Sequence, residues 1–361
     1  MPAAPSAPAP VSRASAGAGS PDGGPRAATP LPAAGPARAD WKRELATAFR
    51  HPRDLLHHLG LGDQTGIASD EAARELPMLV PRGFAALMRA GDADDPLLRQ
   101  VLPRPAELLH PAHYVLDPVG DAAACRVPGL LQKYAGRALL LPTGACAVHC
   151  RYCFRRHFPY ADHSSGGRLE SALRELAACP DLREVILSGG DPLMLDDDAL
   201  AALIGRLRRV PHLRRLRLHS RLPIVLPSRV TPALRRLLGA HGRRTMVVVH
   251  ANHPAELGPQ AADALALLAG DGIPLLNQSV LLQGVNDDVA VLAELAERLF
   301  DLGVSNYYLH QLDRVRGAAH FEVDDRRARA LMDGLRSVLP GYLVPRLVRE
   351  QPGAPSKTPV S

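Results

Sequence analysis

The chain has 361 residues, 46% of them apolar, which is enough for a substantial core in two domains or in one α/β barrel with additions. Its formal net charge of +6 comes from arginines spread along the sequence, which indicates solvated helix faces and not a direct nucleic-acid interface. The five cysteines do not form a disulfide framework, and no apolar run approaches the length of a membrane span. We therefore expect a cytoplasmic protein that binds neither nucleic acid directly nor a membrane.

The first two segments of the chain carry no readable chemistry. Residues 1–39 are mainly Ala, Pro, Gly and Ser, and they cannot bury enough surface to offset their ordering entropy, so we predict a disordered tail. In residues 40–125 apolar side chains recur at helix spacing, beginning with Trp41, Leu45 and Phe49. This spacing predicts a helical N-terminal domain.

From residue 126 to 345, short apolar strands alternate with helical segments. Strands are predicted at 138–142, 184–188, 214–219, 245–250, 274–282 and 305–310. Helices are predicted at 169–178, 198–209, 232–240, 259–269, 289–302 and 325–338. Parallel strands joined by helices form a barrel or an open sheet, and six repeats fall short of the eight of a complete barrel. The pattern predicts an α/β fold.

Three cysteines follow the first of these strands at the spacing C-x3-C-x2-C: Cys146, Cys150 and Cys153. Thiolates this close together can bind three corners of a [4Fe–4S] cluster and leave the fourth iron without a protein ligand. An iron with open positions can bind a small chelating molecule and pass it an electron. The alternative is a structural zinc site with His157 as the fourth ligand, which the spacing favours less.

The stretch C-A-V-H-C-R-Y-C (146–153) resembles the cluster loop of radical S-adenosylmethionine (SAM) enzymes. The family implies a partial (βα)6 barrel, with chemistry at the carboxyl ends of the strands, in which SAM chelates the open iron and is cleaved to a 5′-deoxyadenosyl radical. After the second predicted strand, Gly189 and Gly190 let the backbone approach a ligand, and the Asp191 carboxylate can accept from an ammonium group. These three residues resemble the family motif that holds the amino group of SAM.

The C-terminal segment, residues 346–361, is rich in turn-forming residues and contains Lys357. Most lysines near a chain end are solvated charges, but the Pro-Gly-rich stretch before Lys-Thr-Pro resembles the segment that binds pyridoxal phosphate (PLP) in lysine 2,3-aminomutases. A lysine amine can form a Schiff base with the aldehyde of that cofactor. The resemblance runs from about residue 100 to 361 and includes four further stretches: 219–231, 250–257, 277–287 and 307–313.

The resemblance to lysine 2,3-aminomutases implies a role for several residues. Arg155 matches the arginine that binds the substrate carboxylate, and a planar guanidinium suits that group. Asp313 and Glu350 match two acids that hold the ε-ammonium group of lysine, the second lengthened from aspartate. Residues near PLP in the family fall at three positions of this chain: Lys133, Tyr134 and Arg137.

Two departures from the clostridial members of that family indicate a branch. Asp288 stands where those enzymes have a zinc-binding cysteine, and the chain stops four residues after Lys357. Both features resemble the bacterial aminomutase-like protein that supplies (R)-β-lysine for modification of translation elongation factor P. The resemblance implies an isomerase that converts L-α-lysine into (R)-β-lysine, uses a [4Fe–4S] cluster, SAM and PLP, and is linked functionally to elongation factor P and its lysyl-ligase.

Two other functions remain consistent with these motifs. One is a radical SAM enzyme without PLP, in which Lys357 is only a surface charge. The other is a non-enzymatic zinc module that uses three cysteines and His157 to recruit a partner. Iron and zinc content would separate the second alternative from the first, and PLP binding would test Lys357.

Overall fold

The computed structural model describes residues 41–162, 168–240 and 244–360. The predicted disordered tail, residues 1–39, therefore lies outside the described residues. Within the described ranges, no helix combines the length and the apolar composition needed to cross a membrane.

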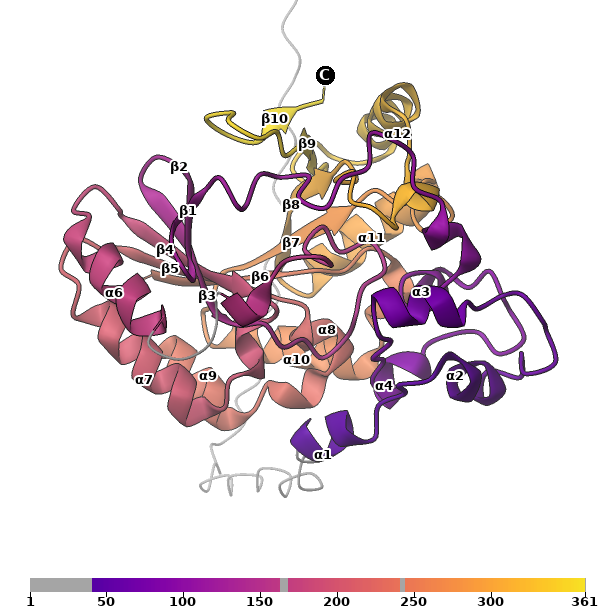
Figure 1. The fold of residues 1–361 in the computed structure, drawn as a ribbon, viewed down its shortest axis with the longest axis horizontal. Helices are drawn as coiled ribbons and strands as arrows, with labels where there is room; N and C mark the ends of the chain where they lie inside the picture. Colours follow the sequence, from indigo (N-terminus) through magenta and orange to yellow (C-terminus); the bar gives the residue numbers. More distant parts are fainter. Residues whose placement is uncertain (1–40, 163–167, 241–243, 361) are drawn as a thin grey trace, which may run out of the picture. The chain divides into compact units, whose positions relative to one another are not determined.

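The fold is organised around one sheet, in which ten strands of the described chain are paired in sequence order (Figure 1). The strands are β1 (Cys125–Val127), β2 (Leu130–Tyr134), β3 (Arg137–Thr143), β4 (Glu184–Gly189), β5 (Arg215–Ser220), β6 (Arg244–Val249), β7 (Leu275–Val280), β8 (Val304–His310), β9 (Arg346–Arg349) and β10 (Thr358–Pro359). Strands β3 to β9 are parallel, and antiparallel pairing adds β1 and β2 at one edge and β10 at the other. The carboxyl ends of seven strands therefore meet at one edge of the sheet.

Six βα units make up the centre of the fold, as the sequence predicts. The helices after β3 to β8 are α6 (Arg168–Ala178), α7 (Asp197–Arg208), α8 (Leu222–Val225) with α9 (Pro232–Gly239), α10 (Pro259–Gly270), α11 (Val289–Asp301) and α12 (Asp325–Val338). Helices α6, α7, α9 and α10 lie along one face of the sheet in Figure 1. The predicted partial (βα)6 barrel is confirmed, and four strands that were not predicted as such extend its edges: β1, β2, β9 and β10.

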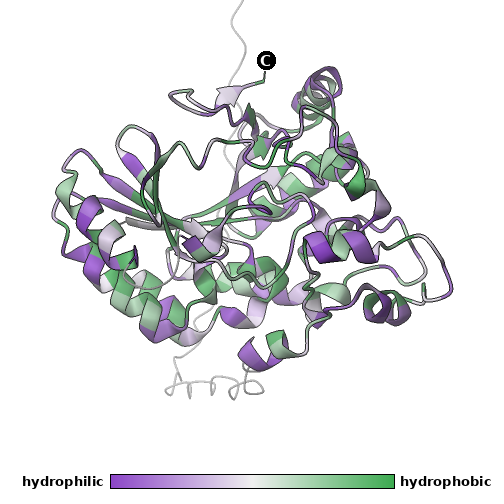
Figure 2. Ribbon diagram, in the orientation of Figure 1, coloured by the Kyte–Doolittle hydropathy of each residue, from purple (hydrophilic) through white to green (hydrophobic). Residues whose placement is uncertain are grey.

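The longer helices of the barrel have one buried face, and α7 shows why it forms where it does. Its first turn is capped by Asp196, whose side chain accepts a hydrogen bond from the backbone N–H of Ala199 at 2.9 Å. Leu200, Leu203 and Leu207 recur at helix spacing and are buried. Figure 2 shows the same alternation of hydrophobic and hydrophilic residues along the outer helices.

The N-terminal region consists of short helices, in agreement with the helical prediction. They are α1 (Trp41–Ala46), α2 (Pro52–His58), α3 (Asp70–Glu75), α4 (Arg82–Ala85), α5 (Pro96–Arg99) and the 3-10 helix η1 (Pro105–Leu108). Buried side chains of this region, such as Phe49, Leu55 and Phe84, belong to the same hydrophobic cluster as the sheet and its helices. The described residues form one compact unit, and the predicted domain boundaries stay a prediction.

Candidate active site

The loop after β3 carries the three predicted metal-binding cysteines, whose thiols are free and half-buried. Burial, reinforced by the charge of Asp191, holds the pKa of Cys146 well above its usual value, and burial raises the pKa of Cys153 to about 11. Such thiols stay protonated near neutral pH unless a metal stabilises the thiolate. Three thiols in one loop at the spacing C-x3-C-x2-C fit an iron–sulfur cluster.

His157 does not complete a zinc site with these cysteines. Its Nε2 atom lies 3.1 Å from the carbonyl oxygen of Arg316. Across the ranges that the structure describes, no group of three or more His, Cys, Asp or Glu side chains is arranged to hold a metal ion. A zinc ion needs four ligands that converge on a point, and His157, which contacts Arg316, does not supply the fourth.

The cysteine loop is fastened to the N-terminal helices by buried ion pairs. Arg151 and Arg156 both donate to Oε2 of Glu107 on η1, at 2.6 and 2.8 Å, and all three side chains are fully buried. Arg151 also donates to the carbonyl oxygens of Leu76 and Ala72, at 2.6 and 3.0 Å. Because a buried arginine is stable only when its donors are paired, these contacts fix the path of the loop. The N-terminal helical region therefore holds the cysteine loop in place, a role that its sequence did not indicate.

The two glycines after β4 are required by a close approach between two backbone segments. Gly189 has a φ of 112°, and a Cβ atom there would lie 2.6 Å from the carbonyl oxygen of Thr143. A Cβ atom on Gly190 would lie 2.3 Å from the carbonyl oxygen of Ala145. Both distances are shorter than any real contact of this kind, so only glycine fits. The sequence predicted an approach to a ligand, and the contact found is with the start of the cysteine loop.

The carboxylate of Asp191 is buried and accepts three hydrogen bonds from the protein. Its Oδ2 atom accepts from Oγ of Ser220 at 3.0 Å and from the backbone N–H of Arg221 at 2.7 Å, and its Oδ1 atom accepts from the backbone N–H of Leu193 at 3.0 Å. Burial raises the pKa of Asp191 to about 6, although these hydrogen bonds oppose the shift. Asp191 therefore joins the end of β4 to the end of β5, and its predicted role in binding SAM stays a prediction.

A row of alternating charges leads away from the cysteine loop. Arg155 donates through Nε to Asp121 at 2.6 Å and through Nη1 to Oγ of Ser188 at 3.1 Å. Asp121 also pairs with Lys133 at 2.7 Å, and Lys133 lies 3.6 Å from Glu350. Despite burial, the charge of Arg155 holds the pKa of Asp121 below its ordinary value. The sequence analysis did not identify Asp121. Only the fold brings this acid next to Arg155 and Lys133, two residues that the sequence analysis had singled out.

Lys357 lies in a hairpin that no sequence pattern predicted. Strand β10 pairs with β9 so that Thr358 faces Arg349, which brings the neighbouring Lys357 and Glu350 together across the turn. Nζ of Lys357 donates to Oε2 of Glu350 at 2.6 Å, and the hydroxyl of Tyr134 donates to Oε1 at 2.7 Å. The charge of Lys357 holds the pKa of Glu350 below its ordinary value, against the effect of burial.

Asp313 follows β8 and lies near the same lysine, but its carboxylate accepts no hydrogen bond from the residues that the structure describes. Burial raises the pKa of Asp313 to about 7, with the charges of Lys357 and Glu350 acting in opposite directions. Arg137 also lacks an ion pair within the described chain, and its guanidinium stacks 4.4 Å from the ring centroid of Tyr134. The structure thus brings the predicted residues of this end together. Among the described residues, Asp313 accepts no hydrogen bond through its carboxylate and Arg137 forms no ion pair.

Four further polar atoms at this edge of the sheet are buried without a partner among the residues that the structure describes. They are Nε2 of His219, His250 and His310 and Oε1 of Gln278, on or directly after β5, β6, β8 and β7. Burial lowers the pKa of His250 to about 4 and keeps the other two imidazoles neutral as well. Buried polar atoms are nearly always paired, so a group of four without partners fits a polar ligand bound there. The sequence analysis included them in matching stretches and gave them no role.

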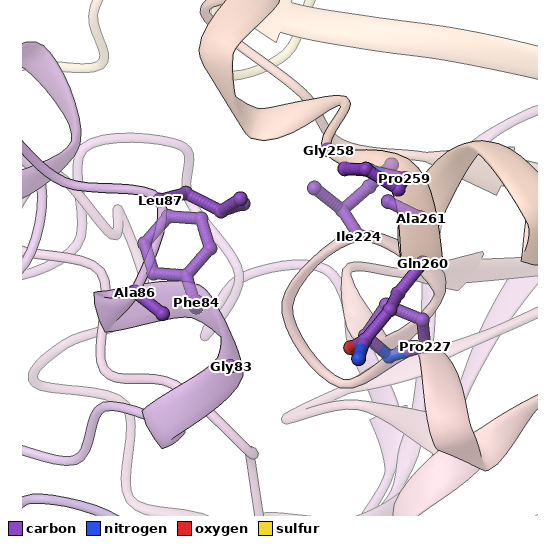
Figure 3. A pocket seen from close by; sticks show the side chains of 10 residues that line it. All are labelled: Gly83, Phe84, Ala86, Leu87, Ile224, Pro227, Gly258, Pro259, Gln260 and Ala261. Atoms are coloured by element: carbon purple, nitrogen blue, oxygen red, sulfur yellow. The ribbon is translucent and has the colours of Figure 1, made fainter.

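An apolar pocket of about 280 Å³ lies between α4 and the segment around α8 and α10 (Figure 3). Phe84 and Leu87 line one side of it, and Ile224, Pro227 and Gly258 line the other. Its lining contains none of the predicted site residues. This pocket is separate from the polar edge of the sheet.

Comparison with known proteins gives a consistent family. Residues 140–296 match the model of the radical SAM superfamily. The chain is 48% identical over 327 residues to an L-lysine 2,3-aminomutase of Escherichia coli, covering 90% of this chain and 95% of the relative. It is 43% identical to the protein of that name from Haemophilus influenzae, covering 88% of this chain and 95% of the relative.

A more distant relative differs in length as well as in identity. The L-lysine 2,3-aminomutase of Clostridium subterminale is 35% identical to this chain, with 89% of this chain and 77% of that protein covered. These matches agree with the (βα)6 barrel that the structure shows. The chain belongs to the radical SAM lysine 2,3-aminomutase family.

Proposed function

We propose that this protein is a PLP-dependent lysine 2,3-aminomutase that converts L-α-lysine into (R)-β-lysine. The observation that carries the proposal is the position of Lys357, which pairs with Glu350 at 2.6 Å beside the unpaired carboxylate of Asp313. The amine of Lys357 is a potential nucleophile, and the carboxylate of Asp313 is free to bind a cation. Both lie at the edge of the sheet where the cysteine loop also begins. This arrangement suits an amino-acid substrate held next to a radical source.

The reaction requires a radical because the bond that must be broken is unactivated. Moving an amino group from C2 to C3 of lysine requires removal of a C3 hydrogen, which general-base chemistry near neutral pH cannot achieve. The cluster and SAM, when bound, supply a primary carbon radical that can remove it, and PLP supplies an aldehyde that takes up the migrating amino group. The protein's own residues bind, orient and shield the substrate.

Arg155 is the residue that we assign to the substrate carboxylate. Its Nε and Nη1 atoms are held by Asp121 and Ser188, which leaves Nη2 without an acceptor among the described residues. A guanidinium oriented in this way presents its free donor in a fixed direction and loses little entropy on binding an anion. Its neighbours Phe154 and Phe158 lie 4.8 and 6.0 Å from the guanidinium carbon, which limits access of water on that side.

The ε-ammonium group of lysine is assigned to Asp313 first and to Glu350 second. Glu350 is already paired with Lys357, and it also accepts from Tyr134. Asp313 has no such partner among the described residues, and a cation entering this edge of the sheet would offset the burial that raises its pKa. The substrate would therefore be held at both ends by opposite charges.

PLP is assigned to Lys357, with Arg137 as the main phosphate ligand. Lys133 is occupied by Asp121 at 2.7 Å and by the carbonyl oxygen of Val119 at 2.8 Å. Arg137 is free of ion pairs within the described chain and stacks on Tyr134, whose hydroxyl reaches Glu350. A planar cation beside an aromatic ring suits the phosphate and the pyridine ring of the cofactor.

We place the activity in the cytoplasm and propose that its product is used by a lysyl-ligase to modify elongation factor P. The support is the higher identity to the Escherichia coli relative, 48% against 35% for the clostridial one. Asp288 adds to it, because its side chain accepts from the backbone N–H groups of Ala290 and Val291 and begins α11 as an ordinary helix cap.

The proposal is tested with protein reconstituted anaerobically with iron and sulfide, then supplied with SAM, PLP, a reductant and one amino acid at a time. We expect β-lysine to form from L-lysine and from no other common amino acid. Lys357→Ala should lose bound PLP and β-lysine formation while iron content and slow SAM cleavage remain, because the two cofactors use separate residues. Lys42→Ala is the control, because Lys42 is an exposed lysine near the opposite end of the described chain. This variant should keep bound PLP, β-lysine formation, iron content and SAM cleavage.

Two results would contradict this function. Full PLP binding by Lys357→Ala would remove the lysine from the site. Wild-type protein that cleaves SAM but never binds PLP would favour a radical SAM enzyme without PLP.

A further inference from the structure

We propose that Arg221 is a positioning residue for the cluster, which donates a hydrogen bond to the Cys150 sulfur and thereby raises the reduction potential of the bound iron–sulfur cluster. Nη1 of Arg221 lies 2.8 Å from Sγ of Cys150, although 71 positions separate the two residues in the chain. The inference concerns the cluster alone and is independent of lysine and PLP.

The guanidinium of Arg221 is fixed from several sides. Nη2 donates to Oε1 of Gln100 at 2.7 Å and to Oε2 of Glu256 at 2.8 Å. The rings of Phe84 and Tyr152 each have their centroid 5.6 Å from the guanidinium carbon. The side chain is 6% exposed, so solvent does not compete for its donors. An arginine held in this way keeps its direction when a cluster binds next to it.

The main-chain N–H of the same residue donates to Asp191 at 2.7 Å. Since Asp191 follows β4 and Arg221 follows β5, one residue connects the ends of two strands to the cysteine loop. Parallel pairing holds β4 and β5 side by side, so the fold sets where the residues that follow these strands lie. The direction of the Arg221 donor is therefore set by the fold and not by the loop.

Glu256 balances the charge of Arg221 in this buried position. Its side chain is fully buried and also accepts from the backbone N–H groups of Asn252 and His253, at 2.9 and 3.1 Å. The pair carries no net charge, but Arg221 contacts the sulfur directly and Glu256 lies behind it. The field at the sulfur is therefore positive, and Glu256 moderates it.

A reduced cluster carries one more negative charge than an oxidised one. A donor that points at a ligating sulfur stabilises the reduced form more than the oxidised form, and hydrogen bonds to the sulfurs are one of the factors that set cluster potentials. The electron itself comes from an external low-potential one-electron donor. Arg221 thus eases the reduction that must precede SAM cleavage.

The test is a redox titration of the reconstituted cluster, without SAM, lysine or PLP, followed by electron paramagnetic resonance. With Arg221→Gln we expect the ratio of reduced to oxidised cluster at a fixed potential to fall at least tenfold, a shift of about 59 mV for one electron. Iron content should remain about four per chain. Arg221→Lys keeps the charge but loses the planar, forked arrangement of donors. The shift in reduction potential should therefore be smaller than in Arg221→Gln.

Arg229→Gln is the matched control. Arg229 lies in the same connection and is equally buried, but it pairs with Asp197 at 2.8 Å and with the carbonyl oxygens of Leu193 and Leu195. Removing it should lower stability without changing the potential. A potential that shifts equally in both variants would show a general effect of a lost buried cation and overturn the proposal.

Glu256→Gln provides a test with the opposite sign, which holds even if Arg221→Gln fails to fold. Glutamine keeps the shape and the acceptor oxygen but removes the negative charge behind Arg221, so the potential should rise. A lower or unchanged potential in Glu256→Gln, with the cluster intact, would overturn the proposal.

Discussion

At the scale of single residues, the site divides into charges that are paired and charges that are not. Asp121, Lys133, Arg155 and Glu350 satisfy one another, whereas Asp313 keeps an unpaired carboxylate whose pKa burial raises to about 7. Asp313 is half-buried, and a carboxylate without a partner there has unused capacity to bind a cation. Asp313 is therefore the residue whose replacement should report most directly on the substrate.

Asp313→Asn is expected to raise the KM for lysine about tenfold or more, because a buried charge-assisted contact contributes roughly 1.5–3 kcal/mol. The variant keeps the shape of the side chain and removes one negative charge. Norleucine, which has lysine's carbon chain without the ε-amino group, serves as the control substrate in a double-mutant cycle. Equal losses for lysine and norleucine would mean that Asp313 does not contact the ε-ammonium group.

The same residue predicts a pH dependence. Because burial raises the pKa of Asp313 from 3.8 to about 7, the side chain is largely neutral below that pH in the free enzyme and ionised above it. The KM for lysine should therefore fall as the pH rises through about 7 in the wild type. In Asp313→Asn this step should disappear, and its persistence would assign the titration to another group.

At the scale of elements, the sequence predicted the strands and helices of the barrel because both have strong periodic patterns and lie in βα order. It did not predict β1, β2, β9 and β10, which are two to five residues long and too short for a pattern to be recognised. The cysteines and Lys357 could be found because they stand in local motifs. Asp121 and Arg221 could not, since their function depends on partners that are distant in sequence.

The contact between the end of β4 and the cysteine loop gives a prediction about glycine. Gly190→Ala places a Cβ atom 2.3 Å from the carbonyl oxygen of Ala145, so the loop must move and iron content after reconstitution should drop. Gly205→Ala is the control, because Gly205 lies in α7 with no atom within 4 Å of the added carbon. There we expect full iron content and a gain of roughly 0.5–1 kcal/mol in unfolding free energy. Normal iron content in Gly190→Ala would contradict the packing argument.

At the scale of the whole molecule, the N-terminal helices and the barrel share one core. Glu107 on η1 holds two arginines of the cysteine loop, and Phe84 on α4 packs near Arg221. Helices of four to seven residues have little stability of their own, so they depend on the barrel as much as the loop depends on them. The sequence pattern predicted the N-terminal helices and the barrel as separate domains, because it does not show that each depends on the other for its packing.

Removing residues 1–109 should therefore abolish cooperative unfolding of the remaining chain and its ability to retain iron. The cut exposes the apolar surface that α4 and α5 cover and removes Glu107, the acceptor that Arg151 and Arg156 share, so the path of the cysteine loop is no longer fixed. Removing residues 1–39 alone is the control and should leave the melting temperature and the iron content unchanged. A stable, iron-binding fragment from the longer deletion would show that the barrel folds by itself.

The hairpin of β9 and β10 has a consequence for the order in which the site is assembled on the ribosome. The three cysteines and the partners that fasten their loop to η1 are synthesised before the middle of the barrel, whereas Lys357 follows the last parallel strand. A nascent chain interrupted before β9 would carry all three cysteines of the loop and lack Lys357, the lysine that we propose binds PLP. Translation therefore produces the cysteine loop first and the hairpin that carries Lys357 last.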